Sequence, residues 1–128
     1  TFGLLGCKPY LGLSGNPAAA YVGFEMLARP AIRKMRGFSE GARPVQQATL
    51  THGVKKRQDR RFFDRATVLR DPETGELLVT EAKTQNSALL GTMQRSNCLL
   101  RIDEGPCELK PGDVVDVVRV DLPEGTVL

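Results

Sequence analysis

The spacing of apolar residues changes near Pro44, and the change divides the chain into a helical part and a β part. Before Pro44, apolar side chains recur every three or four positions, which predicts one apolar stripe along a helix. The stripe consists of Ala20, Phe24, Leu27, Ala28, Ala31 and Met35. After Pro44, short runs of Val, Leu, Thr and Phe alternate with turn residues, as is typical of a small β-barrel or sandwich. The predicted strands cover residues 45–50, 61–70, 76–83, 98–102 and 113–121.

The helix is expected to follow a short strand over residues 8–13. Asn16 is a good N-cap, and proline is favoured at the first helical position, which Pro17 occupies. Pro30 falls inside the apolar stripe, so a kink or short break is expected near residues 28 and 29. Gly37 predicts the end of the helix.

Turn residues mark the connections between the predicted strands. The clearest hairpin joins residues 66–70 to 76–79 through the Asp-Pro-Glu-Thr-Gly turn. A Lys-Pro-Gly-Asp turn at 110–113 precedes the last strand, whose five valines predict burial on both faces. One or two helical turns are expected within residues 87–95, and a domain boundary is expected within 38–44, where the apolar period disappears.

Composition limits the classes of protein that the chain can represent. With 128 residues, 41% apolar and 26% charged, it is one globular domain or one domain plus a piece of another. Three cysteines without CxxC spacing argue against a disulfide framework and a zinc ribbon, so reduced thiols and no metal ligands are expected. No signal-peptide pattern and no run long enough to cross a bilayer are seen, which predicts a cytoplasmic protein without a membrane partner. The first residue is Thr, which suggests part of a longer protein.

Basic residues gather at 55–65, although the net charge of the whole chain is only +3. This segment contains six basic and two acidic residues, which gives a local net charge of +4, and it includes Phe62 and Phe63. A β-barrel that binds single-stranded nucleic acid is therefore an alternative function. The low aromatic content, and the acidic Asp59 and Asp64 within the run, make nucleic acid an unfavoured partner. The segment 55–57 is expected to be a solvated loop.

The Gly-Asn-Pro turn allows two interpretations. A strand that ends in such a turn leaves the first N–H groups of the next helix and the positive end of its dipole facing outward, which suits an anion. The simpler interpretation is that the turn only starts the helix. The residues alone favour the simpler interpretation.

The phrases "RPAIRKMRG", "RRFFDRATV" and "LKPGDVVDVVRV" resemble segments of the MoeA and gephyrin E-domain family of molybdopterin molybdenumtransferases. The phrase "RPAIRKMRG" at residues 29–37 resembles the end of the third domain, which closes with a strand, a Pro-Gly-Asn-Pro loop and a helix. Three later segments resemble the small fourth domain of the family: "RRFFDRATV", "TQNSALLGTMQRSNCLLRI" and "LKPGDVVDVVRV". The resemblance implies a mainly β chain, in which residues 1–38 are the C-terminal remnant of an α/β third domain. Residues 39–44 would be a linker and residues 45–128 the fourth-domain β-barrel.

The resemblance also implies a function. Members of the family insert molybdate into adenylylated molybdopterin and release AMP, with Mg²⁺ as cofactor, and they act as homodimers. The intact protein would be this enzyme. The catalytic residues are expected in domains that precede this sequence, so the chain alone is expected to be inactive and to hold no cofactor tightly. A third possibility is a gephyrin-like scaffold, whose barrel binds peptide partners without chemistry.

Site residues follow from the positions that match the family's motifs. Arg65 matches the second Arg of the barrel motif and Ser87 the Ser of Gln-x-Ser; both are associated with molybdate. In the family, residues of the third domain line one side of the substrate-binding cleft. The positions that match them here are Lys8, Ser14, Gly15, Asn16 and Pro17. Ser14 stands where the family usually has Pro, which relaxes the backbone and adds a hydroxyl. From the residues alone, Arg65 would be a solvated charge on a strand and Ser87 a helix cap.

Overall fold

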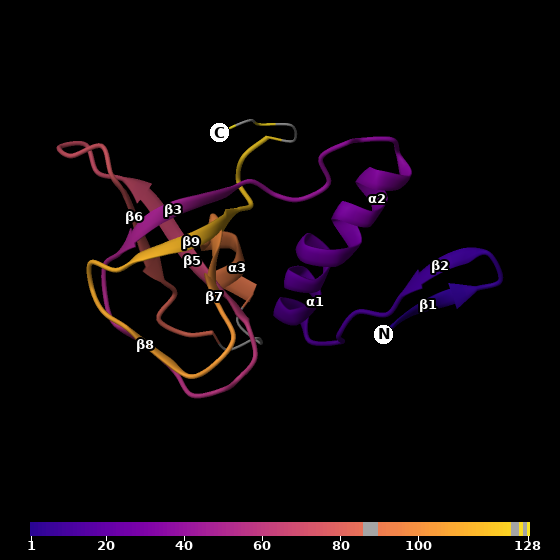
Figure 1. The fold of residues 1–128 in the computed structure, drawn as a ribbon, viewed down its shortest axis with the longest axis horizontal. Coiled ribbons are helices and arrows are strands. Elements are labelled where there is room, and N and C mark those ends of the chain that lie inside the picture. The colour runs from indigo at the N-terminus through magenta and orange to yellow at the C-terminus, as the bar shows by residue number, and fades with distance from the viewer. Residues whose placement is uncertain (86–89, 124–125, 127) are drawn as a thin grey trace. The chain divides into compact units, whose positions relative to one another are not determined.

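The structure, a computed structural model, describes residues 1–85, 90–123, 126 and 128. The chain divides into two compact units, whose main parts are Thr1–Arg43 and the residues from Pro44 onward. Figure 1 shows the helices and strands of each unit. The assignment of residues 1–38, 39–44 and 45–128 to domains stays a prediction.

The first unit contains a hairpin and an irregular helix. Strand β1 (Phe2–Leu5) pairs antiparallel with β2 (Lys8–Leu11). The predicted strand over 8–13 is thus two residues too long, and β1 was not predicted because its Phe-Gly-Leu-Leu sequence does not alternate. Gly6 has a φ of 64° in the two-residue turn, a conformation that glycine adopts without strain.

The helix continues through three segments, α1 (Pro17–Gly23), the π-helical η1 (Phe24–Ala28) and α2 (Arg29–Met35). Pro30 has no N–H to donate, and the π turn lies immediately before it, where the Arg29 N–H reaches the Phe24 carbonyl. The irregularity expected near residues 28 and 29 is therefore present as a π turn. Of the helices that the structure describes, none has the length and apolarity to span a bilayer.

The second unit is a closed five-stranded barrel, so the predicted mainly β fold is confirmed. Its strands follow one another around the barrel in the order β3-β6-β5-β7-β9, and only the β3 and β6 pair is parallel (Figure 1). Their bounds are β3 (Val45–Leu50), β5 (Phe62–Arg70), β6 (Leu77–Glu81), β7 (Cys98–Ile102) and β9 (Val114–Arg119). The predicted hairpin is formed by β5 and β6, with Val68 opposite Val79.

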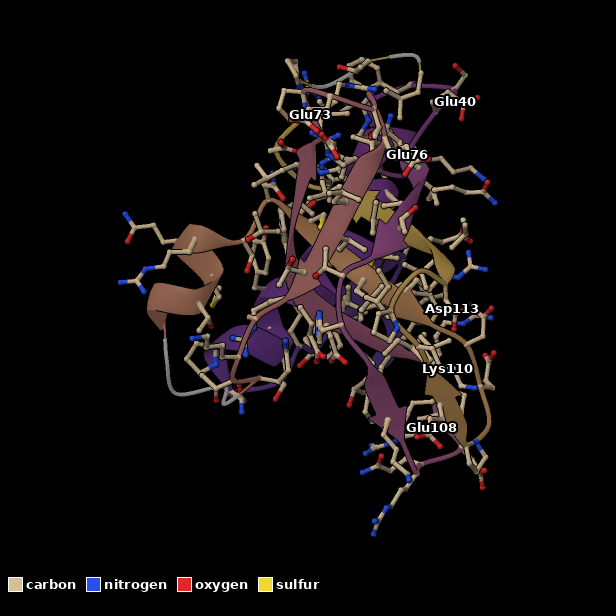
Figure 2. All side chains as sticks on the ribbon, turned by 90° about the vertical axis from the view of Figure 1, so that its left-hand side faces the viewer. Glu40, Glu73, Glu76, Glu108, Lys110 and Asp113 are labelled. Atoms are coloured by element: carbon tan, nitrogen blue, oxygen red, sulfur yellow. The ribbon has the colours of Figure 1, made fainter. Side chains whose placement is uncertain are left out.

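Two short strands, β4 (Val54–Lys56) and β8 (Cys107–Leu109), form a separate ribbon, and α3 (Leu90–Arg95) precedes β7. In Figure 2 the β5–β6 turn, marked by Glu73 and Glu76, and β8, marked by Glu108, lie at opposite ends of the barrel. The ribbon was not predicted, and its Lys56 is 3% exposed, so the expectation of a solvated loop at 55–57 is wrong for this residue.

Alternation along the strands fills the barrel with small and medium apolar side chains. The core is formed by Ala48, Leu50, Val54, Ala66, Val68, Val79, Cys98, Leu100, Ile102, Val115 and Val117. Burial raises the pKa of the Cys98 thiol to about 12, so this cysteine is an apolar core residue. Burial of both faces of β9 holds for Val117 and Val118, whereas Val114 at its start is 63% exposed.

Candidate functional site

Arg65 lies in the middle of β5 and is 2% exposed. Its position in the strand alternates with Asp64 and Ala66, and Ala66 belongs to the barrel core, so Arg65 extends from the outer side of the barrel wall. The interpretation of Arg65 as a solvated surface charge is wrong. A buried guanidinium requires hydrogen-bond partners, because removing its charge from water is costly.

Gln85 supplies part of that environment. Its Oε1 accepts the Arg65 backbone N–H at 2.9 Å and the Arg65 Nε–H at 3.4 Å. Its Nε2 donates to the Arg65 carbonyl at 2.9 Å and to the Ala82 carbonyl at 3.4 Å. One amide therefore contacts both the backbone and the side chain of Arg65. Gln85 is the first residue of the Gln-x-Ser phrase, from which only Ser87 is predicted as a site residue.

Ser87, the second predicted molybdate ligand, lies outside the described residues. The segment that contains it is flanked by a second amide contact on β5. The Val68 N–H donates to Asn97 Oδ1 at 2.8 Å, and Asn97 Nδ2 donates to the Val68 carbonyl at 2.9 Å. Gln85 and Asn97 thus tie the two flanks of residues 86–96 to the same strand.

The predicted loop lies in the other unit, at the start of the helix. Asn16 is the N-cap, and its Oδ1 accepts the N–H groups of Ala18 at 3.1 Å and Ala19 at 3.3 Å. Ser14 Oγ accepts the Asn16 N–H at 3.2 Å. The helix therefore does not present the Ala18 and Ala19 N–H groups to an anion, contrary to the expectation of unoccupied donors. Lys8 and the loop residues, Ser14, Gly15, Asn16 and Pro17, are exposed.

The basic run at 55–65 does not form one charged face. Lys56 and Arg65 are buried, Lys55 lies 3.7 Å from Glu108, and Arg61 lies 3.0 Å from Glu104. The Lys56 ammonium is 5.3 Å from the Phe62 ring and donates to the carbonyls of Arg60 and Asp103. Burial and pairing remove much of the local excess of positive charge, which counts against the nucleic-acid alternative.

Sequence reasoning missed a group of ionisable side chains in the barrel. Asp64 hydrogen-bonds the Glu81 carboxyl, and His52 Nε2 lies 3.6 Å from Glu81 Oε2. Burial first, and then the charge and the hydrogen bond of Glu81, raise the pKa of Asp64 to about 6, while Arg65 and Lys56 oppose the rise. Asp64 therefore keeps its proton to a higher pH than an exposed aspartate does. These residues are far apart in the sequence, and only the strand register brings them together.

The surface has a cavity in one unit and a groove in the other. A cavity of about 290 Å³ on the barrel is lined by the β7, β8 and β9 segments, including Arg101, Cys107 and Asp116. An apolar groove of about 410 Å³ in the first unit lies between the hairpin and the helix, with Leu27, Ile32 and Met35 among its lining residues. Within the described part of the chain, no three His, Cys, Asp or Glu side chains are grouped so that they could hold a metal ion.

Comparison with known proteins agrees with the barrel. Residues 47–120 match the family model described as the MoeA C-terminal region (domain IV). The chain is 33% identical over 121 residues to molybdopterin molybdenumtransferase 1 of Mycobacterium tuberculosis (strain CDC 1551 / Oshkosh). It is 30% identical over 114 residues to molybdopterin molybdenumtransferase of Staphylococcus aureus (strain Mu50). These matches cover 91% and 89% of this chain but only 28% and 27% of the two relatives.

Solved structures show the same fold. A molybdopterin biosynthesis MoeA protein from Pyrococcus horikoshii matches 92% of this chain and 28% of its own, with a TM-score of 0.69 and 24% identity. A molybdenum cofactor biosynthesis protein from Pyrococcus furiosus matches 83% of this chain and 36% of its own, with a TM-score of 0.64 and 24% identity. The chain thus has the fold of one part of longer proteins.

Proposed function

Since the chain belongs to the MoeA C-terminal region (domain IV) family, we propose that it is part of an enzyme of molybdenum cofactor biosynthesis. The proposed enzyme is a molybdopterin molybdenumtransferase, which inserts molybdate into adenylylated molybdopterin and releases AMP. Both relatives described above carry the name of this activity. The chain spans about 28% of the length of the first of them, so the proposal concerns the whole protein.

The physical task is to hold molybdate beside a second anion, the phosphate-bearing pterin, against their repulsion. Arginine suits this task because its planar group offers several donors in fixed directions and keeps its charge. Burial strengthens such contacts by lowering the local dielectric. The observation that carries the proposal is the burial of Arg65 on a barrel strand, at 2% exposure, inside the segment that matches the family.

The other predicted residues have secondary parts in the proposal. Ser87 would donate one hydroxyl hydrogen bond to molybdate. On the third-domain side, Lys8 and the loop from Ser14 to Pro17 would contact the substrate. Because the Asn16 side chain accepts the N–H groups of Ala18 and Ala19, these donors are not assigned to the substrate. The contacts from this side would be made by the Lys8 ammonium and by the Ser14 hydroxyl of the loop.

Magnesium, a homodimer and a cytoplasmic location complete the proposal. Among the residues that the structure describes, the acidic side chains do not form a group that fits Mg²⁺, so no step is assigned to the metal here. Its ligands are expected in the part of the relatives that this chain does not span.

The test is calorimetric titration of the 128-residue chain with molybdate at low salt. We expect weak, saturable binding, and a loss of affinity of about tenfold or more in Arg65→Ala, because one charge-assisted contact is removed. Arg61→Ala is the matched control, since Arg61 lies nearby but is exposed and paired with Glu104. Far-UV circular dichroism checks that each variant keeps the barrel. Equal affinity of wild type and Arg65→Ala would contradict the assignment of Arg65.

A further inference from the structure

We propose that Gln85 is a positioning residue that holds Arg65 in the orientation required for binding an oxyanion. The inference rests on the proposed function, because it concerns the same anion site. It adds a residue whose side chain acts through Arg65 and has no assigned contact with substrate.

The first step of the argument concerns the backbone. Strand β6 ends at Glu81, and the Ala82 N–H still reaches the Arg65 carbonyl at 2.9 Å. Beyond that point the amide of Gln85 takes over, since it accepts the Arg65 N–H and donates to the Arg65 carbonyl, both at 2.9 Å. A side-chain amide therefore completes the hydrogen-bond ladder at the residue where the neighbouring strand has ended. This contact fixes the backbone from which the guanidinium extends.

The second step concerns the guanidinium. The same Gln85 Oε1 lies 3.4 Å from Arg65 Nε, on the side of the group nearest the backbone. An oxyanion bound by Arg65 would then be contacted through the Nη nitrogens at the far end. A planar donor group loses little freedom on binding when its direction is already set. Gln85 sets this direction without charge, so it does not neutralise the group that must attract the anion.

Asn97 provides an internal comparison. Its amide makes the same reciprocal pair of hydrogen bonds, at 2.8 and 2.9 Å, with the backbone of Val68 on the same strand. Both amides anchor β5, but only that of Gln85 also contacts a guanidinium. Asn97→Ala therefore imitates the structural loss of Gln85→Ala while leaving Arg65 in place.

The experiment follows the Arg65 Nε–H signal by ¹⁵N NMR in wild type, Gln85→Ala, Asn97→Ala and Gln85→Glu, before and during titration with molybdate. We expect hydrogen exchange at this Nε–H to be about tenfold faster in Gln85→Ala and within about twofold of wild type in Asn97→Ala. We expect molybdate affinity to fall about tenfold in Gln85→Ala and to be kept in Asn97→Ala. Gln85→Glu should keep the Nε–H protected but lose molybdate, because a carboxylate repels the oxyanion.

Three results would overturn the inference. One is equal exchange at the Arg65 Nε–H in Gln85→Ala and Asn97→Ala, and another is equal molybdate affinity in these two variants. The third is wild-type affinity in Gln85→Glu. Failure of the proposed function looks different, because molybdate would then leave the Arg65 signal unchanged in wild type. The exchange comparison would in that case still decide whether Gln85 orients Arg65.

Discussion

Asp64 is a carboxyl whose protonation the barrel changes in mildly acidic solution. Its pKa is raised to about 6 from 3.8, mainly by burial and then by Glu81. The folded state therefore binds a proton on Asp64 between about pH 4 and pH 6 that the unfolded chain has already lost. The free energy of unfolding must fall as pH rises through this range. Above it, the folded barrel carries the cost of an ionised, partly buried Asp64.

We predict that Asp64→Asn increases the free energy of unfolding at pH 7.5 by about 2 kcal/mol. A shift of two pKa units corresponds to about 2.7 kcal/mol, and the partial exposure of Asp64 to solvent lowers this energy. The amide keeps a donor for Glu81 and carries no charge. Urea unfolding at pH 4 and pH 7.5, followed by far-UV circular dichroism, measures the difference. Asp59→Asn is the control, because Asp59 is exposed. The same pH dependence in wild type and Asp64→Asn would contradict the prediction.

Single residues also show where sequence reasoning reached its limit. Arg65 was selected from a family motif, whereas its burial and its contact with Gln85 depend on where β6 ends. Lys56 belongs to the basic segment 55–57, which the sequence predicts to be a solvated loop. In the three-residue strand β4, alternation turns Val54 and Lys56 inward together. A strand of three residues is too short for its alternation to be recognised in a sequence.

At the scale of elements, the barrel strands were predictable and the packing of the helix was not. β3 and β7 have the predicted bounds, because turn residues and alternation define short strands clearly. The apolar stripe of the helix predicted a buried face, yet Leu27 and Met35 are 58% and 70% exposed within this chain. The buried side chains of the helix include Glu25, Arg29 and Arg33, which periodicity alone places in solvent.

These charged side chains hold the segment 38–43 against the helix. Arg43 binds Glu25 through two hydrogen bonds, of 2.7 and 3.2 Å. Arg29 Nη1 donates to the Gly41 carbonyl at 3.2 Å, and Arg33 Nε donates to the Glu40 carbonyl at 3.0 Å. The phrase "RPAIRKMRG" therefore contains two arginines that bind the chain following it. The segment after the helix is tied down by these contacts, although its composition is that of a linker.

We predict that Glu25→Gln weakens the attachment of segment 38–43 to the helix and lowers the local stability of the first unit by about 3 kcal/mol, because it removes the buried negative charge beside Arg29 and Arg43. Hydrogen exchange of the amides in residues 17–43 should become faster, while that of the barrel stays unchanged. Glu40→Gln is the matched control, because the Glu40 side chain is exposed and Arg33 contacts the backbone carbonyl of this residue. Equal exchange in the two variants would show that the Glu25 charge is not needed.

At the scale of the whole molecule, the main boundary between the two units falls between Arg43 and Pro44. Arg43 is held within the first unit by Glu25, and the carbonyl of Pro44 accepts the Arg119 N–H at 2.9 Å within the second. Of the predicted site residues, Arg65 belongs to the second unit, whereas Lys8 and the loop from Ser14 to Pro17 belong to the first. The proposed reaction needs further groups, because it breaks the bond between the pterin phosphate and AMP.

We predict that the 128-residue chain alone releases no AMP from adenylylated molybdopterin in the presence of molybdate and Mg²⁺. Arg65 is a proposed anion contact, but the described residues hold no group of side chains suited to a metal ion, and the matched relative is more than three times as long. The measurement is chromatographic detection of AMP, with the intact Mycobacterium tuberculosis relative as the positive control. AMP above the protein-free level would mean that the transfer chemistry lies within this chain, and the role of Arg65 would then extend beyond binding.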